Sequence, residues 1–164
     1  MSIIHKTNGI RYLSVEDLIN INEYAITSFT PLEGCGVLDL GKLKSAQQRP
    51  NNYRYYEHCE DIYTLAAVLF IAVNKAHAFK NANKRTAFMA SMCFLLMNGY
   101  CFEPYPESVI EASLNVAKNI DPYLDPVMLS SWFKAFSEVA TTEELEESLY
   151  SSSETFQAAL DFDC

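Results

Sequence analysis

Two long apolar segments, residues 60–76 and 83–98, lie on either side of one short polar segment. The first begins with two carboxylates and is then apolar on nearly every side, which is typical of a central helix surrounded by other helices. The second has the same character, and Gly99 follows it as a left-handed C-terminal cap. The chain must therefore fold around two buried helices that are joined by a short polar loop.

The rest of the chain shows apolar residues at helical spacing and no sustained alternation of the strand kind, which predicts an all-α fold. Ser14 is placed to cap a helix that ends near Phe29. Two further helices fit residues 106–119 and 126–140, and each has a proline near its first turn.

Residues 34–56 precede the central helix and are rich in turn-forming residues. They predict a short helix near residues 43–48 and a break at Pro50, together with a hairpin or loop. No internal repeat or low-complexity linker appears before residue 140.

Charge is distributed unevenly along the 164 residues. The formal net charge of −9 comes from 21 acids and 12 bases, which argues against a general nucleic-acid-binding or membrane-binding surface. Residues 1–137 hold all 12 bases and 13 of the acids, whereas residues 138–164 hold eight acids and no base. We therefore expect a nearly neutral domain over residues 1–137 and an acidic C-terminal extension over residues 138–164 that could add one or two short amphipathic helices.

The cysteines form no CxxC pair and lie mostly in apolar contexts, so we expect reduced, buried thiols rather than a disulfide framework. The N-terminus lacks a basic stretch followed by an uninterrupted apolar run, and the longest apolar runs are too short to span a bilayer. These features predict a soluble cytoplasmic protein. The five cysteines are Cys35, Cys59, Cys93, Cys101 and Cys164.

The polar segment between the two buried helices, HAFKNANKRTA at residues 77–87, holds the residues best suited to chemistry. The free N–H groups at the start of the second helix form an anion site that the helix dipole strengthens. The small side chain of Ala82 lets a phosphate approach the backbone there. Lys84 and Arg85 add two cations beside the site.

His77 lies at the opposite side of this loop, where a neutral imidazole could accept a proton from an incoming hydroxyl group. Phe79 would anchor the loop in the core. Each residue alone is more often structural or merely solvated, but together they describe transfer of a phosphate group from a nucleotide.

The same segment resembles the signature of the Fic/Doc family, which reads His-x-Phe-x-acid-small-Asn, then Gly or Lys, then Arg. The version with Lys84, and with Thr-Ala after the arginine, is similar to the Doc (death-on-curing) branch of toxins from addiction modules. Residues 36–50 are also similar to the family, and the resemblance covers about residues 8–137. It implies a compact Fic/Doc-like helical bundle with a short flap or hairpin before the central helix, where relatives align a target peptide.

The resemblance further implies a toxin that transfers a phosphoryl group from ATP to a hydroxyl group of a host protein, elongation factor Tu in the characterised case, and so blocks translation. His77 would be the general base, and Asn83 would orient the phosphates or the loop. Lys84, Arg85 and the amides near Ala82 would bind the phosphates. An antitoxin protein would be a partner, because toxins of this type are held by an antitoxin segment that folds on binding.

Two other activities stay open at this stage. In most Fic proteins a glycine occupies the position of Lys84, and AMP is transferred instead. Because a lysine would crowd that arrangement, the sequence favours phosphoryl transfer over protein adenylylation. A catalytically silent module that binds a nucleotide or an antitoxin is the remaining alternative.

Asn81, in the expected phosphate-binding loop, occupies the position of the acid that binds Mg²⁺ in the family. A neutral amide oxygen is a weaker Mg²⁺ ligand than a carboxylate. Three outcomes follow: activity with a more loosely held metal, a substitute carboxylate from elsewhere, or nucleotide binding without efficient turnover. Glu57, Glu60 and Asp61 are candidates for the substitute.

Overall fold

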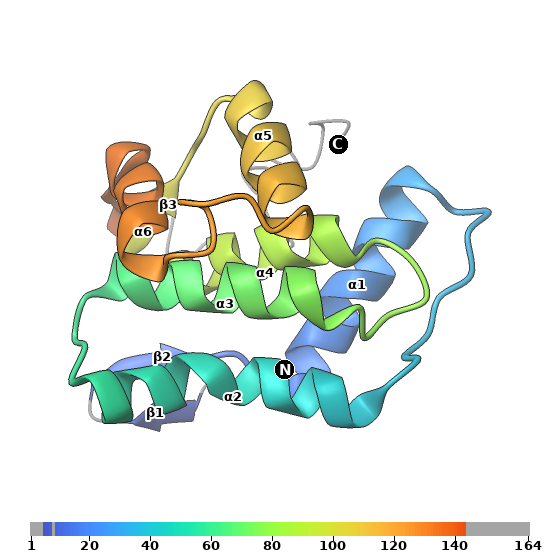
Figure 1. Ribbon diagram of the computed structural model, residues 1–164, viewed down its shortest axis with the longest axis horizontal. Helices are drawn as coiled ribbons and strands as arrows, with labels where there is room; N and C mark the ends of the chain where they lie inside the picture. Colours follow the sequence, from blue (N-terminus) through green and yellow to red (C-terminus); the bar gives the residue numbers. More distant parts are fainter. Residues whose placement is uncertain (1–4, 8, 144–164) are drawn as a thin grey trace.

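The computed structural model describes residues 5–7 and 9–143, which form six helices and four short strands (Figure 1). In chain order the elements are β1 (His5–Thr7), β2 (Ile10–Tyr12), α1 (Val15–Phe29), α2 (Leu40–Glu57), α3 (Ile62–Ala76), α4 (Asn83–Met97), β3 (Tyr100–Phe102), α5 (Pro106–Ala117), α6 (Pro126–Ala135) and β4 (Ser137–Val139). The predicted helical class is confirmed. The strands escaped prediction because each has only three residues, too few to show alternation.

The central helix is α3, which contacts α2, α4, α5 and α6. Its N-cap Asp61 accepts hydrogen bonds from the main-chain N–H and the hydroxyl group of Thr64 at 3.0 and 2.6 Å. From Thr64 to Phe70 every residue of α3 is buried, as a helix that is apolar on nearly every side requires. Neighbours on so many sides fix the direction of α3 and therefore the position of the loop that follows it.

An aromatic cluster joins the C-terminal part of the domain to α3. Phe133 of α6 packs against Phe70 of α3 and Phe102 of β3, with ring centroids 5.9 and 4.9 Å apart. Trp132 packs against the same two rings at 5.7 and 5.1 Å. The aromatic residues of α6 therefore serve core packing.

The break predicted at Pro50 is wrong, because α2 runs without interruption from Leu40 to Glu57. Proline lacks an N–H and crowds the preceding turn, which costs about 3 kcal/mol in a helix interior. Leu43, Ala46 and Pro50 are all buried and lie on one side of α2. The packing of this side offsets the cost, and no hairpin forms between α2 and α3.

The helix predicted over residues 126–140 ends earlier, at Ala135. Residues 137–139 instead pair as β4 with β3, in the antiparallel register Tyr100↔Val139. Strand β4 therefore includes the first residues of the acidic extension. Residues 144–164, where further helices are expected, lie outside the described part of the chain.

The four cysteines in the described part of the chain are free thiols. Cys101 is buried, but Cys35 is exposed, so the expectation of uniformly buried thiols is wrong at that position. Cys35 lies between two glycines in the irregular segment before α2, which leaves its side chain in solvent. No helix among the described residues is long and apolar enough to cross a bilayer.

The Asp61 cap of α3 gives a test of this arrangement. We expect Asp61→Ala to lower the free energy of unfolding by about 1 kcal/mol, because the N–H of Thr64 loses its acceptor. Asp61→Asn keeps an acceptor oxygen and should retain most of the stability. Urea denaturation followed by circular dichroism measures both, and equal loss in the two variants would contradict the capping role.

Candidate functional site

The polar segment singled out in the sequence forms the loop between α3 and α4, residues 77–82, called the motif loop below. Its first and last residues, His77 and Ala82, both adopt the left-handed conformation, with φ of 47° and 60°. His77 ends α3 and Ala82 precedes the first turn of α4. The two left-handed residues reverse the chain between two core helices, so the loop is held at both ends by buried structure.

Residues 31–39, called the flap below, run alongside the motif loop between α1 and α2 (Figure 1). Val37 and Phe79 form an antiparallel bridge. The N–H of Leu38 donates to the carbonyl oxygen of Ala78 at 2.7 Å, and the N–H of Lys80 donates to the carbonyl oxygen of Gly36 at 3.0 Å. The expected flap is therefore an extended segment paired with the motif loop, in place of a hairpin.

Gly36 is required for this close approach. Its φ is +143°, a conformation that L side chains rarely adopt, and a Cβ added there would lie 3.3 Å from Cε of Lys80. The aliphatic part of the Lys80 side chain thus lies against the flap at Gly36, where the flap has no side chain.

Asn83 holds the motif loop from inside α4. Its Oδ1 accepts from the N–H of Phe79, and its Nδ2 donates to the carbonyl oxygen of Phe79, each at 3.0 Å. The Phe79 ring is 2% exposed, so the middle of the loop is fixed by its side chain in the core and by both of its main-chain polar groups. The Asn83 side chain therefore binds the main chain of the motif loop in this structure.

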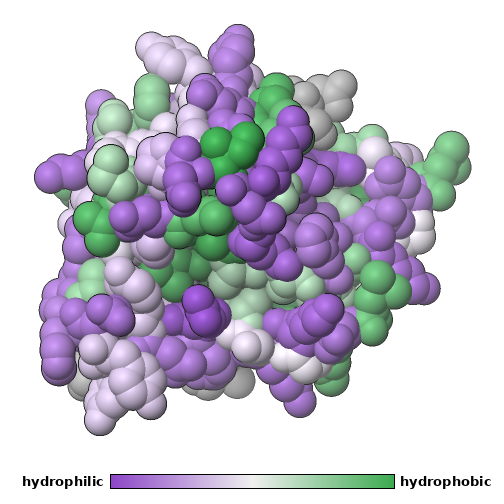
Figure 2. Space-filling view, in the orientation of Figure 1, coloured by the Kyte–Doolittle hydropathy of each residue, from purple (hydrophilic) through white to green (hydrophobic). Residues whose placement is uncertain are grey.

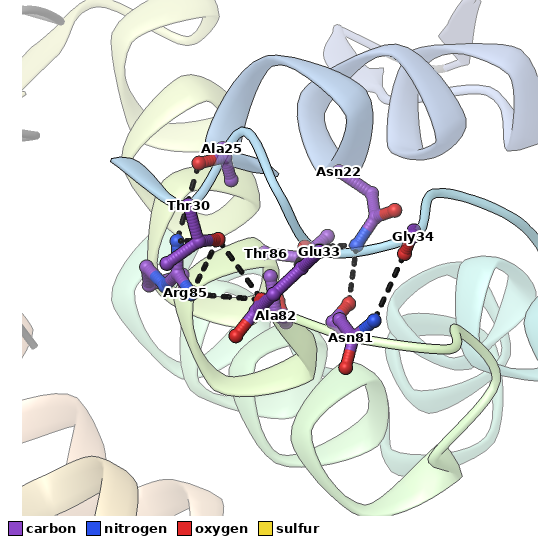
Figure 3. A network of polar contacts seen from close by, with 9 residues as sticks. All are labelled: Asn22, Ala25, Thr30, Glu33, Gly34, Asn81, Ala82, Arg85 and Thr86. Atoms are coloured by element: carbon purple, nitrogen blue, oxygen red, sulfur yellow. Dashed lines mark hydrogen bonds and ion pairs between the residues drawn. The ribbon is translucent and has the colours of Figure 1, made fainter. Parts of the chain in front are cut away.

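A buried asparagine of α1, Asn22, holds the end of the loop. Its Nδ2 donates to the carbonyl oxygen of Asn81 at 2.8 Å and to Oγ1 of Thr86 at 3.0 Å (Figure 3). Thr86 in turn donates to the carbonyl oxygen of Ala82 at 2.7 Å. Asn22 is 1% exposed, so this link crosses the core between α1 and α4.

Arg85 extends from α4 toward the end of α1. Its Nη1 donates to the carbonyl oxygen of Ala25 at 3.2 Å and to Oγ1 of Thr30 at 3.3 Å. Its Nη2 lies 3.7 Å from Oε2 of Glu33 in the flap, and Figure 3 shows these partners around the guanidinium group. In this structure Arg85 therefore joins α1, α4 and the flap.

The anion site predicted at the start of α4 keeps its main-chain donors. Ala82, the N-cap, makes no side-chain capping bond, and the N–H of Thr86 makes the first bond back to Ala82, at 2.9 Å. The N–H groups of residues 83–85 are those that a helix leaves without an intrahelical acceptor. Lys84 in this turn and His77 across the loop are both exposed. The motif loop and the first turn of α4 thus bring together main-chain donors, a cation and an imidazole.

The residues present do not fit a carboxylate-held Mg²⁺ ion. Within the described residues, no three His, Cys, Asp or Glu side chains come close enough to hold a metal. Asp61 caps the far end of α3, roughly 22 Å from the motif loop at 1.5 Å per residue. Glu60 beside it pairs with Arg54 at 2.8 Å, and Glu57 ends α2 at the same end of the domain. The three candidate acids therefore cannot replace the missing carboxylate.

The flap contains two more acids, and both have structural partners. Glu33 accepts from the hydroxyl group of Thr30 at 2.9 Å as well as pairing with Arg85. Asp39 accepts from the N–H of Lys42 at 3.0 Å and so caps α2. Neither is free to serve as a simple substitute for the acid at position 81.

Sequence reasoning missed the groups outside the motif that hold it, chiefly Asn22, Thr30, Glu33 and Gly34. One signal was available for Asn22, because it lies among the inward positions Leu18, Ala25 and Ile26 of an amphipathic helix. A polar residue at such a position needs a buried partner. The partners themselves are about 60 residues away in the chain and give no local signal.

The fold and the site together define a helical domain that presents a His-to-Arg motif on the loop between its two central helices. The Fic/DOC family model matches residues 12–95, about half of the 164 residues. A segment of 98 residues, 60% of the chain, is 31% identical to a protein named Protein kinase doc from Escherichia phage P1 and covers 76% of that protein. The chain belongs to the Fic/Doc family.

Replacing Asn22 tests the link between α1 and the motif loop. We expect Asn22→Leu to lower the free energy of unfolding by about 1 to 3 kcal/mol, because the Asn81 carbonyl and the Thr86 hydroxyl lose a buried donor. Asn20→Leu is the matched control, since Asn20 is exposed on the same helix. Urea denaturation measures both, and equal effects would show that the buried bonds contribute nothing specific.

The left-handed conformation of Ala82 gives a second test. A β-branched residue strongly disfavours this conformation, so Ala82→Val should destabilise the protein by about 1 to 3 kcal/mol. Ala82→Gly should be tolerated, because glycine adopts positive φ freely. The two melting temperatures measure the difference, and a valine variant as stable as the glycine variant would contradict the requirement.

Proposed function

We propose that this protein is a Doc-like toxin that transfers the terminal phosphoryl group of ATP to a hydroxyl group of a cytoplasmic host protein, elongation factor Tu or a protein like it. One observation carries the proposal: an exposed imidazole, His77, faces solvent on the same loop that ends in the uncapped first turn of α4. Family membership and the similarity to a protein named as a kinase support the same activity.

In the proposed reaction the phosphates of ATP bind at the free N–H groups of residues 83–85. Lys84, exposed in that turn, adds a positive charge. The hydroxyl oxygen of the target attacks the terminal phosphorus, the bond to the bridging oxygen of ADP breaks, and His77 takes the hydroxyl proton. The main-chain donors stabilise charge on the transferred group. No step is assigned to a metal ion.

Lys84 is the reason to favour phosphoryl over adenylyl transfer. Transfer of AMP requires attack at the innermost phosphorus with pyrophosphate leaving, which places two phosphates deeper in the turn. A lysine side chain occupies space there that glycine leaves open. An antitoxin whose disordered segment folds on this protein is the regulatory partner we propose.

The test uses two histidines with the same backbone setting. His77 and His58 each end a helix in the left-handed conformation, with φ of 47° and 51°, and both are exposed. We expect His77→Ala to abolish transfer, with a loss of at least about 100-fold for a missing general base. His58→Ala should keep wild-type activity. The measurement incubates each purified protein with ATP and Mg²⁺ in cell lysate and determines the intact masses of modified proteins.

The mass increments separate the candidate activities. A phosphoryl increment that depends on His77 supports the proposal. An adenylyl increment replaces it with nucleotidyl transfer, and no increment dependent on His77 points to a silent binding module.

A further inference from the structure

We propose that Asn81 is a positioning residue that holds the flap against the motif loop through its side-chain amide. An acid, which the family pattern has at this position, cannot make the same bond. The consequence for catalysis rests on the proposed function, whereas the structural role does not. The inference comes from one juxtaposition: the Asn81 side chain bridges to Gly34 while its main chain is bound by Asn22.

The geometry requires a donor at position 81. Nδ2 of Asn81 lies 2.9 Å from the carbonyl oxygen of Gly34. Because a carbonyl oxygen only accepts, the atom of Asn81 that faces it must be the nitrogen. Figure 3 shows the amide nitrogen directed at Gly34 and the side-chain oxygen directed away from it. An ionised carboxylate in this place would have no proton to donate and would face the carbonyl oxygen with a negative charge.

The Asn81 bond extends the pairing of the two segments. The N–H groups of Leu38 and Asp39 both donate to the carbonyl oxygen of Ala78, at 2.7 and 3.2 Å, and Lys80 donates to Gly36. These main-chain bonds reach only as far as Gly36 on the flap. The Asn81 side chain adds Gly34, two residues nearer to α1.

The flap depends on polar contacts because, apart from Val37, its side chains bury little apolar surface. Gly34 and Gly36 give it more backbone freedom than other residues would, so fixing it costs more conformational entropy. Leu32, Cys35 and Leu38 are exposed and contribute little burial. Apart from the main-chain pairing, the described side chains that join the flap to α4 or the motif loop by hydrogen bond or ion pair are Asn81 and Arg85, which contacts Glu33.

Asn22 fixes Asn81 from the other side. The carbonyl oxygen of Asn81 accepts from the buried Nδ2 of Asn22, so residue 81 is held to α1 through its main chain and to the flap through its side chain. The role of Asn81 is thus defined by two bonds with different partners. Under the proposed function, this arrangement sets the position of the flap beside His77, where the target hydroxyl must be presented.

The test compares Asn81→Asp and Asn81→Leu with wild type by hydrogen exchange of the full chain, read at the amides of Leu38, Asp39 and Lys80. Asn52→Asp is the matched control, since Asn52 is exposed on α2 and the change in charge is the same. We expect the three amides to exchange about fivefold faster in both Asn81 variants at neutral pH, the factor for a net hydrogen bond of about 1 kcal/mol. The control should leave their exchange unchanged.

A pH series separates the hydrogen bond from general damage to the loop. Below the ordinary aspartate pKa of about 3.9, the carboxyl group introduced by Asn81→Asp is protonated and can donate again. The ratio of the exchange rates of these amides in Asn81→Asp to those in wild type at the same pH should then return toward one. In Asn81→Leu the amides should exchange faster than in wild type at both pH values. Exchange of α6 amides in the same samples reports whether each variant is folded.

Unchanged exchange of the flap and loop amides in a folded Asn81→Asp protein would overturn the proposal. The proposal would also be overturned if Mg²⁺ stimulated phosphoryl transfer by Asn81→Asp while amide exchange in the flap stayed unchanged. Position 81 would then be a metal-binding position whose acid is missing in the wild-type protein. The exchange measurement needs no transfer activity. The hydrogen-exchange result can therefore be interpreted even if no phosphoryl transfer is detected. The transfer assay can likewise be interpreted if the exchange rates do not change.

Discussion

Burial of α3 by helices on several sides is the constraint on which the rest of the structure depends. A helix with seven consecutive buried residues, from Thr64 to Phe70, cannot rotate or slide without exposing apolar surface. Its partner α4 is buried to a similar extent, so the short connection between them has little freedom in where it begins and ends. The motif loop therefore owes its position to the buried, apolar parts of two helices, which themselves lie away from the polar groups of the site. Figure 2 shows one face of the molecule, on which apolar residues gather in the middle among largely polar surroundings.

Around this frame, hydrogen bonds hold each part of the loop separately. Asn83 binds the main chain of Phe79, Asn22 binds the main chain of Asn81, and the flap pairs with Ala78 and Lys80. The Asn83 bonds join residues only four apart, whereas the bonds from Asn22 and from the flap join segments that are distant in the sequence. A loop fixed in this way keeps His77 and the N–H groups at the start of α4 in one geometry, which is what the proposed stabilisation of a transferred phosphate would require.

Position 81 shows how a family pattern and a particular structure can differ. The family pattern has an acid at this position. In the structure the Asn81 amide joins the motif loop to the flap through a hydrogen bond that needs a donor. Arg85 shows a similar difference. The pattern leads us to expect that it binds phosphate, but in this structure its guanidinium group contacts the end of α1, Thr30 and Glu33. Both residues link the flap to the site, so the flap and the motif loop are joined by side-chain as well as main-chain contacts.

The sequence by itself determined the helical class, the two central helices and the residues of the motif, because apolar periodicity and a short local pattern can be read without knowing distant neighbours. Ser14 was likewise placed to cap a helix, and its side chain accepts from the N–H of Asp17. Only the tertiary structure decided that Pro50 lies within a helix, that Asn22 and Gly34 belong to the site, and that Glu57, Glu60 and Asp61 lie at the opposite end of α3 from it. These outcomes depend on contacts between residues tens of positions apart, and a chain's local pattern does not identify such partners.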